Sequence, residues 1–189
     1  MAKGRSTSKN VIIIGQSGVG KSSLINMLCP EACATTSNDT MGCTKKEQEY
    51  TCNLGAQQCT IHDTIGLEEG RWGFLPDREA QKRLKAYLKT KEPHLLVYCM
   101  PGIRGSLKKS QGRNYKKFKS AVGNVPIVVV VTNLEGFEAP LGNWWSENRN
   151  ELQKLEVKDL SMILPVRLSR PSSGKIFADR FITISCSLT

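Results

Sequence analysis

The fold of this chain is decided by the stretch Val11-Ile12-Ile13-Ile14-Gly15-Gln16-Ser17-Gly18-Val19-Gly20-Lys21-Ser22. Its first four residues are β-branched, which predicts a buried strand of a parallel sheet. Residues 15–22 match the pattern Gly-x-x-x-x-Gly-Lys-Ser/Thr. Residues 22–29 then predict a helix that stops at Pro30. A strand, a glycine-rich loop and a helix in this order are the setting in which the pattern binds phosphate groups.

The chemistry of phosphate binding explains the spacing of this loop. Glycines let the backbone curl so that successive N–H groups point at phosphate oxygens, and the following helix adds its free N–H groups and positive dipole end. We expect Lys21 to reach the β- and γ-phosphates and Ser22 to ligate Mg²⁺. The alternative is a glycine-rich turn without a ligand. The predicted nucleotide-binding residues of this segment are Gly15, Gln16, Ser17, Gly18, Val19, Gly20, Lys21, Ser22 and Ser23.

The rest of the chain alternates between strand and helix patterns. Strands are predicted at 47–53, 57–63, 94–100 and 126–131, and helices at 77–91, 107–122 and 143–157. The first two of these strands are joined by Leu54-Gly55-Ala56, which favours a hairpin. Such alternation predicts an α/β fold of three layers, with a doubly wound, mostly parallel sheet covered on both faces. Leu164-Pro165 is expected to lie in a loop.

The bulk composition fits one globular domain. The chain has 189 residues, 39% of them hydrophobic, and a formal net charge of +10. No apolar run approaches the roughly 20 residues that cross a bilayer, so we expect no membrane-spanning helix. The basic residues of the predicted helices 77–91 and 107–122 favour solvated helix faces, with an anionic membrane surface or nucleic acid as the alternative, so membrane contact is not expected either. Seven cysteines without a Cys-x-x-Cys pair favour reduced thiols in a cytoplasmic protein over a disulfide framework or a zinc site. We expect a basic flexible tail at 1–9, a single domain at 10–189, and an atypical or truncated region at 159–189.

Two further segments predict residues that act at the phosphates. Asp63-Thr64-Ile65-Gly66 follows a predicted strand, where the Asp can hold Mg²⁺ and the Gly N–H can approach a γ-phosphate. A threonine in the polar loop before the second strand can close over Mg²⁺ when a γ-phosphate is present. Thr44 is the preferred candidate for this role, in competition with Thr35, Thr36 and Thr40. The predicted metal ligands are Ser22, Thr44 and Asp63, and the predicted catalytic residues are Lys21, Thr44 and Gly66.

The base is expected to be read by Thr132-Asn133-Leu134-Glu135, which follows the clearest strand of the chain. GTPases usually carry Asn/Thr-Lys-x-Asp at this point, where the Asp accepts two hydrogen bonds from guanine and the Lys stem packs on the ring. Here Asn133 replaces the Lys and Glu135 replaces the Asp, so we expect weaker guanine selectivity. Ile184-Ser185-Cys186-Ser187 is the candidate for the last contact to the base.

Taken together, these motifs resemble the translation-factor class of P-loop GTPases. Within it, the chain resembles septin-like and immunity-associated GTPases, and most closely the short G domain-containing proteins of fungi. The closer resemblance is carried by Gly42-Cys43-Thr44, Asp63-Thr64-Ile65-Gly66-Leu67, Leu95-Leu96-Val97-Tyr98-Cys99 and Trp144-Trp145. It implies a G domain that binds GTP or GDP with Mg²⁺ and hydrolyses GTP slowly. The chain stops where that fold has a last helix, so the helix is expected to be missing or diverged.

The functional expectation is a GTP-binding, Mg²⁺-dependent switch with slow hydrolysis. The position of the water-orienting Gln of Ras-like proteins is Leu67, which has no hydrogen-bonding group. We therefore expect a second copy of the chain, or an activating protein, to supply the missing group, and we expect no specific nucleic-acid partner. The alternatives are a non-catalytic nucleotide-dependent interaction module and a P-loop ATPase or kinase.

Overall fold

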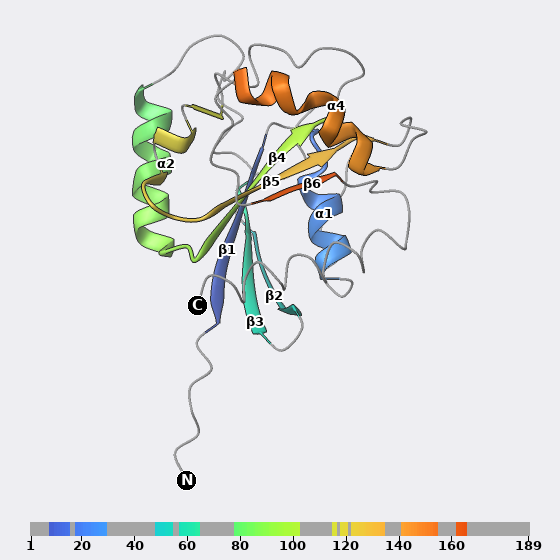
Figure 1. Ribbon diagram of the computed structural model, residues 1–189. Helices are drawn as coiled ribbons and strands as arrows, with labels where there is room; N and C mark the ends of the chain where they lie inside the picture. Colours follow the sequence, from blue (N-terminus) through green and yellow to red (C-terminus); the bar gives the residue numbers. More distant parts are fainter. Residues whose placement is uncertain are drawn as a thin grey trace.

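The fold is seen in a computed structural model that describes residues 8–15, 18–29, 48–54, 57–64, 78–102, 115–116, 118–120, 122–134, 141–154 and 162–165. Within these residues the strands form one six-stranded sheet in the order β2-β3-β1-β4-β5-β6. Helices lie on both sides of this sheet (Figure 1). The predicted α/β class with a doubly wound, mostly parallel sheet is confirmed.

The elements follow one another as the sequence pattern predicts, with ends that shift by a few residues. The strands are β1 (Lys9–Gly15), β2 (Gln48–Leu54), β3 (Gln57–Asp63), β4 (Leu95–Pro101), β5 (Ile127–Thr132) and β6 (Met162–Pro165). The helices are α1 (Lys21–Leu28), α2 (Arg78–Lys91) and α4 (Leu141–Lys154). Of the predicted helix 107–122, the described residues from 115 to 120, and Val122, are helical. Helix α4 begins at Leu141, two residues before the predicted start at 143, and ends at Lys154, three residues before the predicted end.

The strand β1 lies inside the sheet and pairs in parallel with β3 on one side and β4 on the other. The strands β2 and β3 pair antiparallel, from Gln48 opposite Asp63 to Leu54 opposite Gln57, which confirms the hairpin. All six residues of β5 are buried. Burial on both faces is the reason why its pattern is a continuous apolar run, rather than an alternation of polar and apolar residues.

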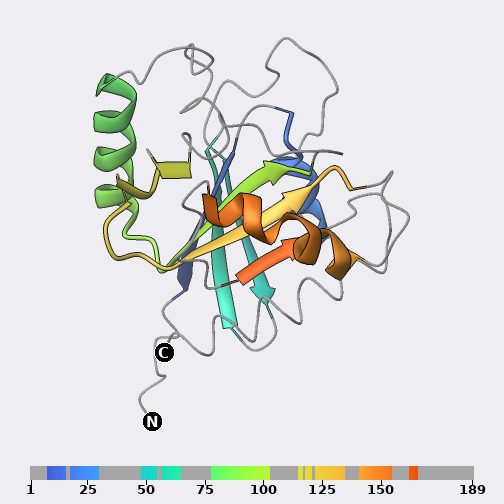
Figure 2. The same ribbon diagram turned by 45° about the horizontal axis from the view of Figure 1, so that its top comes forward.

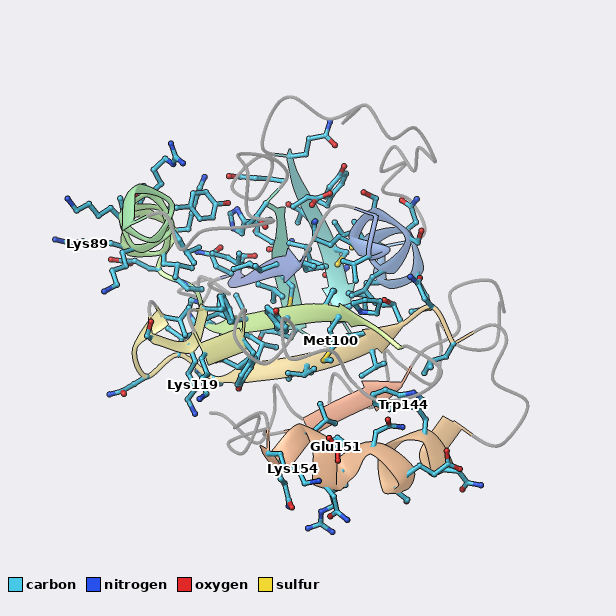
Figure 3. The ribbon with its side chains drawn as sticks, turned by 90° about the horizontal axis from the view of Figure 1, so that it is seen from above. Lys89, Met100, Lys119, Trp144, Glu151 and Lys154 are labelled. Atoms are coloured by element: carbon cyan, nitrogen blue, oxygen red, sulfur yellow. The ribbon has the colours of Figure 1, made fainter. Side chains whose placement is uncertain are left out.

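Two apolar layers hold the helices to the sheet. On one face α1 contributes Leu24, Ile25 and Leu28, and β1 contributes Val11 and Ile13. On the other face α2 contributes Leu84 and Leu88. The helix α4 covers this second face in front of β5 and β6 (Figure 2). There Trp144, which is 2% exposed, lies on the side of α4 that faces the sheet, while Lys89 of α2 points away from the molecule (Figure 3).

The strand β6 corrects the expectation that Leu164-Pro165 lies in a loop. Residues 162–165 form a strand parallel to β5, in a register from Val128 opposite Met162 to Val131 opposite Pro165. A proline lacks the N–H that a central strand needs, but it is tolerated at the edge of a sheet. The strand β6 lies at that edge. Short length and a terminal proline make such a strand hard to see in the sequence.

In the described part of the chain, no helix is both long enough and apolar enough to cross a membrane.

Candidate nucleotide-binding site

The predicted phosphate residues meet at one edge of the sheet. Gly15 ends β1, Asp63 ends β3 and Thr132 ends β5. Because these three strands run parallel, their carboxyl ends lie at the same edge. In open α/β sheets, ligands bind in the crevice outside the carboxyl ends of the strands. The fold therefore collects residues from three distant segments into one candidate site.

The backbone of the phosphate loop takes the conformation that its glycines allow. Gly18 has a φ of 75° and Gly20 a φ of 90°. Both values lie in the left-handed region, which residues other than glycine rarely adopt. Gly20 is also the residue before the first turn of α1, and it has no side chain with which to cap the helix. The first N–H groups of α1 are thus not taken by a capping side chain at this position, and such groups attract anions.

Gly15 is required for a different reason, which is close packing. A Cβ atom at this position would lie 2.5 Å from the Cys99 carbonyl oxygen and 2.9 Å from both Cys99 Cβ and Val19 Cγ1. Val19 is itself buried in the layer beneath α1. The first glycine of the motif therefore allows the backbone at the end of β1 to pack closely against Cys99 of β4.

Lys21 is the buried cation of the site. Its side chain belongs to a residue that is only 8% exposed, and its Nζ donates a hydrogen bond to the Gly15 carbonyl oxygen across the loop. An ammonium group held at low exposure at the start of a helix is suited to an anionic ligand. Ser23, the last predicted residue of this segment, is half-buried in the first turn of α1.

Ser22 and Asp63 form the second charged contact of the site. The Ser22 hydroxyl donates to Asp63 Oδ2 over 3.4 Å, and Asp63 is 1% exposed. Burial raises the pKa of Asp63 to about 6, against the opposing effects of the Lys21 charge and the Ser22 hydrogen bond. Among the described residues, no group donates a hydrogen bond to Asp63 Oδ1. A buried carboxylate oxygen without a donor, beside a serine hydroxyl, fits the oxygen-ligand chemistry of Mg²⁺.

Two buried threonines tie this site to the sheet, and sequence reasoning gave them no such role. The Thr64 hydroxyl donates to the Ile13 carbonyl oxygen over 2.7 Å. The Thr132 hydroxyl donates to the Val19 carbonyl oxygen over 2.7 Å and lies 3.3 Å from the Met100 carbonyl oxygen. Thr132 thus fastens the phosphate loop to the end of β5. The only sequence signal for it is a polar residue that ends a fully buried strand.

The end of the site that is expected to read the base has fewer described contacts. Asn133 is exposed and has a φ of 57°, so the chain turns sharply after β5. The next residue, Leu134, is buried and packs against Gly102, where an added Cβ would lie 2.3 Å from Leu134 Cδ2. Five predicted site residues lie outside the described part of the chain, as does the segment 184–187: Gln16, Ser17, Thr44, Gly66 and Glu135.

Comparison with known proteins identifies the class of site. Residues 10–134 match the family described as 50S ribosome-binding GTPase. The chain belongs to this family. It is therefore a GTP-binding G domain, which confirms the general resemblance to P-loop GTPases. The narrower likeness to septin-like or fungal proteins is not part of that match.

Individual relatives agree with this assignment. The G domain is 31% identical, over 130 residues, to the GTPase Der of Rhodopseudomonas palustris strain BisA53. That alignment covers 69% of the chain but only 27% of Der, so the chain spans little more than a quarter of that relative.

Solved structures share the fold at lower identity. Toc33 from Arabidopsis thaliana, crystallised with GDP and Mg²⁺, has a TM-score of 0.68 at 18% identity, over 96% of this chain and 84% of that one. A GTP-binding protein from Sulfolobus solfataricus in complex with GDP has a TM-score of 0.67 at 15% identity, over 96% of this chain and 53% of that one.

Proposed function

We propose that this G domain is a Mg²⁺-dependent guanine-nucleotide switch that hydrolyses GTP slowly. The observation that carries the proposal is the contact of the Ser22 hydroxyl with the buried Asp63 carboxylate, close to the Lys21 ammonium. These residues come from two segments of the chain and meet beside a loop in which Gly18 and Gly20 have the left-handed conformation. Such an arrangement suits a nucleotide whose phosphates are bound together with a divalent cation.

Each of these residues has a distinct task in the proposal. Lys21 neutralises phosphate oxygens, while the N–H groups at the start of α1 donate to them. Ser22 and Asp63 hold Mg²⁺, directly or through water, and the bound ion offsets the negative charge that develops on the phosphates. Thr132 acts indirectly. Its hydrogen bond to the Val19 carbonyl oxygen holds in place the phosphate loop that precedes Lys21. Thr44 and Gly66 complete the proposed set as the residues that respond to a γ-phosphate.

We propose that the missing catalytic group comes from a second protein. Leu67 stands where Ras-like proteins have a water-orienting Gln, and His62 points to the opposite face of β3 from Asp63. Contacts of His62 with Glu49 (3.3 Å) and Asn10 (3.4 Å) support that direction. The resemblance to septin-like GTPases suggests pairing of two copies across the nucleotide face. One Toc33 structure is described as a dimerization-deficient mutant, so dimers also occur among proteins of this fold.

The setting we propose is the cytoplasm, with a protein partner rather than a specific nucleic acid or a membrane. Four cysteines of the described residues are free, as is usual in a reducing compartment: Cys29, Cys52, Cys59 and Cys99. The basic residues of α2 support no specific nucleic-acid or membrane partner, because a polar, solvent-exposed face is the ordinary feature of a surface helix. The exposed residues of this kind are Lys82, Arg83, Lys85 and Lys89.

The proposal is tested by measuring phosphate release from GTP at saturating nucleotide, over a wide range of protein concentration, with Mg²⁺ or with EDTA. We expect slow release that needs Mg²⁺ and rises with protein concentration. Lys21→Ala should remove it, whereas Lys89→Ala, which deletes an exposed lysine on α2, should not. A rate of order 1 s⁻¹, within the usual range of enzymes, that is independent of concentration would show a complete site. Tight GTP binding without turnover at any concentration would favour the interaction module.

A further inference from the structure

Four of the described cysteines lie on the face of the sheet that α1 covers, and three of them interact with or stand opposite one another: Cys29, Cys52 and Cys59, with Cys99 of β4 as the fourth. Cys29 follows the last turn of α1, where its N–H donates to the Ile25 carbonyl oxygen. Cys52 of β2 and Cys59 of β3 stand directly opposite each other in the antiparallel pair. Cys29 and Cys59 belong to the apolar layer beneath α1, and Cys52 packs against that layer. Among the described residues, no contact of the nucleotide site reported above involves the side chains of Cys29, Cys52 or Cys59.

The three thiols differ in exposure and in partners. Cys29 and Cys52 are hydrogen-bonded to each other through their side chains. Cys59 is 2% exposed, and its thiol lies 3.8 Å from the Gln57 carbonyl oxygen, to which it donates. Cys52 is the most accessible of the three, because Cys29 and Cys59 are buried whereas Cys52 is half-buried. The accessible thiol is thus the one that already contacts a second thiol.

The protonation of the cluster follows from these contacts. The hydrogen bond from Cys29 lowers the pKa of Cys52, whereas the same contact and burial raise the pKa of Cys29. Burial raises the pKa of Cys59 to about 11. Cys52 is therefore the thiol that most readily becomes a thiolate, which is the form that reacts with oxidants. A reactive, accessible thiolate beside a second thiol is the usual arrangement of a redox-sensitive pair.

We propose that Cys52 is a peroxide-sensitive thiol and that Cys29 is its partner in a reversible disulfide between β2 and the end of α1. In the first step the Cys52 sulfur attacks an oxygen of hydrogen peroxide. The O–O bond breaks, an S–O bond forms, and the leaving hydroxide takes the Cys52 proton to become water. In the second step the Cys29 sulfur attacks the Cys52 sulfur. The S–S bond forms, the S–O bond breaks, and hydroxide leaves with the Cys29 proton as a second water.

This disulfide would lie close in the chain to residues that we assign to the nucleotide switch, Lys21 and Thr44. Helix α1 begins at Lys21 in the phosphate loop and ends next to Cys29. In the sequence, the segment from 30 to 51 separates the two thiols and includes Thr44. Oxidation would close this segment into a covalent ring. The cross-link itself does not depend on the proposed GTPase activity, and it can be tested without any nucleotide.

The test is to oxidise the full chain with hydrogen peroxide, block the remaining thiols, and map disulfides by mass spectrometry without reduction. Cleavage after Glu31 and after Leu54, by a glutamate-specific protease and chymotrypsin, separates Cys29 from Cys33 and Cys52 from Cys59. We expect the Cys29–Cys52 link as the main product, lost on addition of dithiothreitol. A main product that joins Cys52 to Cys59, or that uses Cys33 or Cys43, would overturn the proposal.

Two variants sharpen the result. Cys59→Ser removes the neighbouring thiol and should leave the link intact, so its loss in this control would contradict the choice of Cys29. Cys29→Ser should leave a sulfenic acid on Cys52 that reacts with dimedone. No reaction of Cys52 in the parent chain, at peroxide concentrations that oxidise free glutathione, would also overturn the proposal. The parent map decides the question even if a variant folds poorly.

Discussion

The phosphate end and the base end of the site are built in different ways. At the phosphate end, Lys21 and Asp63 are buried, and Ser22 contacts Asp63 directly. At the base end, Asn133 is exposed, and the buried Thr132 directs its hydroxyl toward the phosphate loop. The end whose motif matches the usual GTPase pattern therefore has the buried, charged contacts. The base end, whose motif departs from this pattern, includes Thr132, and the Thr132 hydroxyl donates a hydrogen bond to the phosphate loop.

We propose that the two ends of the site contribute to nucleotide binding in different ways. Phosphate groups are recognised by backbone N–H groups, a fixed loop shape and one ammonium, all of which are supplied by neighbouring residues. A base is recognised by side chains at particular positions after a strand, so one substitution changes selectivity without changing the loop. We therefore expect variants at the phosphate end to alter affinity for every nucleotide, and variants at the base end to alter the choice among them.

The largest effect is expected from Lys21→Ala. Loss of a charge-assisted hydrogen bond costs roughly 1.5–3 kcal/mol, so affinity for GTP and GDP should fall by about 10- to 150-fold. Isothermal titration calorimetry in Mg²⁺ measures this directly. Lys89→Ala is the matched control, because it removes the same charge from an exposed position on α2. Equal affinities of the parent and Lys21→Ala would mean that the phosphates are bound elsewhere.

Asp63→Asn should change stability and ligand binding in opposite directions. Because burial raises the folded-state pKa of Asp63 from 3.8 to about 6, its contribution to stability is fully present below pH 3.8 and is lost as pH rises through 6. At 1.36 kcal/mol per pKa unit, the charged form costs of order 3 kcal/mol at neutral pH. In EDTA, Asp63→Asn should therefore be more stable than the parent at pH 7.5 but not at pH 4.

The measurement for this variant is urea denaturation at the two pH values, together with Mg²⁺-dependent GDP binding at pH 7.5. The variant should lose the effect of Mg²⁺ on GDP affinity while it gains stability. A variant that is less stable than the parent at neutral pH would show that Asp63 is held by donors other than a metal ion. Such a result would remove the main structural argument for Mg²⁺.

Gly15→Ala tests whether the shape of the loop matters apart from its charges. The added methyl group meets the Cys99 carbonyl oxygen of β4 and Val19 Cγ1 of the phosphate loop. Overpacking of this kind costs typically 1–3 kcal/mol. We expect a destabilised protein with weaker GDP binding, seen in thermal unfolding with and without GDP. Gly123→Ala is a useful contrast, since a Cβ there meets nothing within 4 Å and only the φ of 64° is unfavourable.

Thr132→Val should have the smallest effect of this series. It keeps the shape of the side chain but removes the hydroxyl that bonds the Val19 carbonyl oxygen. Loss of one hydrogen bond costs about 1 kcal/mol. We expect a decrease in GTP and ATP affinity by the same factor, because the phosphate loop is loosened for both. Thr132→Ser should restore the affinity. A change confined to GTP would instead place Thr132 in base recognition.

Much of this fold could be predicted from local sequence patterns. The apolar run of β5, the glycines of the phosphate loop and the Leu24-Ile25-Leu28 face of α1 each specify their own conformation within a few residues. Contacts between distant segments could not be predicted in this way. The Thr132 hydroxyl bonds a carbonyl 113 residues away, and no local pattern marks that pairing. The strand β6 is not predicted because it is only four residues long. It is defined by its pairing with β5, which no local pattern indicates.

We propose that the chain binds guanine nucleotides at this edge of the sheet. This central claim is tested most directly by displacement of a fluorescent GDP analogue with GTP, GDP, ATP and XTP in Mg²⁺. We predict that GTP and GDP displace the analogue at concentrations at least tenfold below those of ATP, a difference of about 1.4 kcal/mol. Displacement by ATP at the same concentration as GTP would contradict the claim.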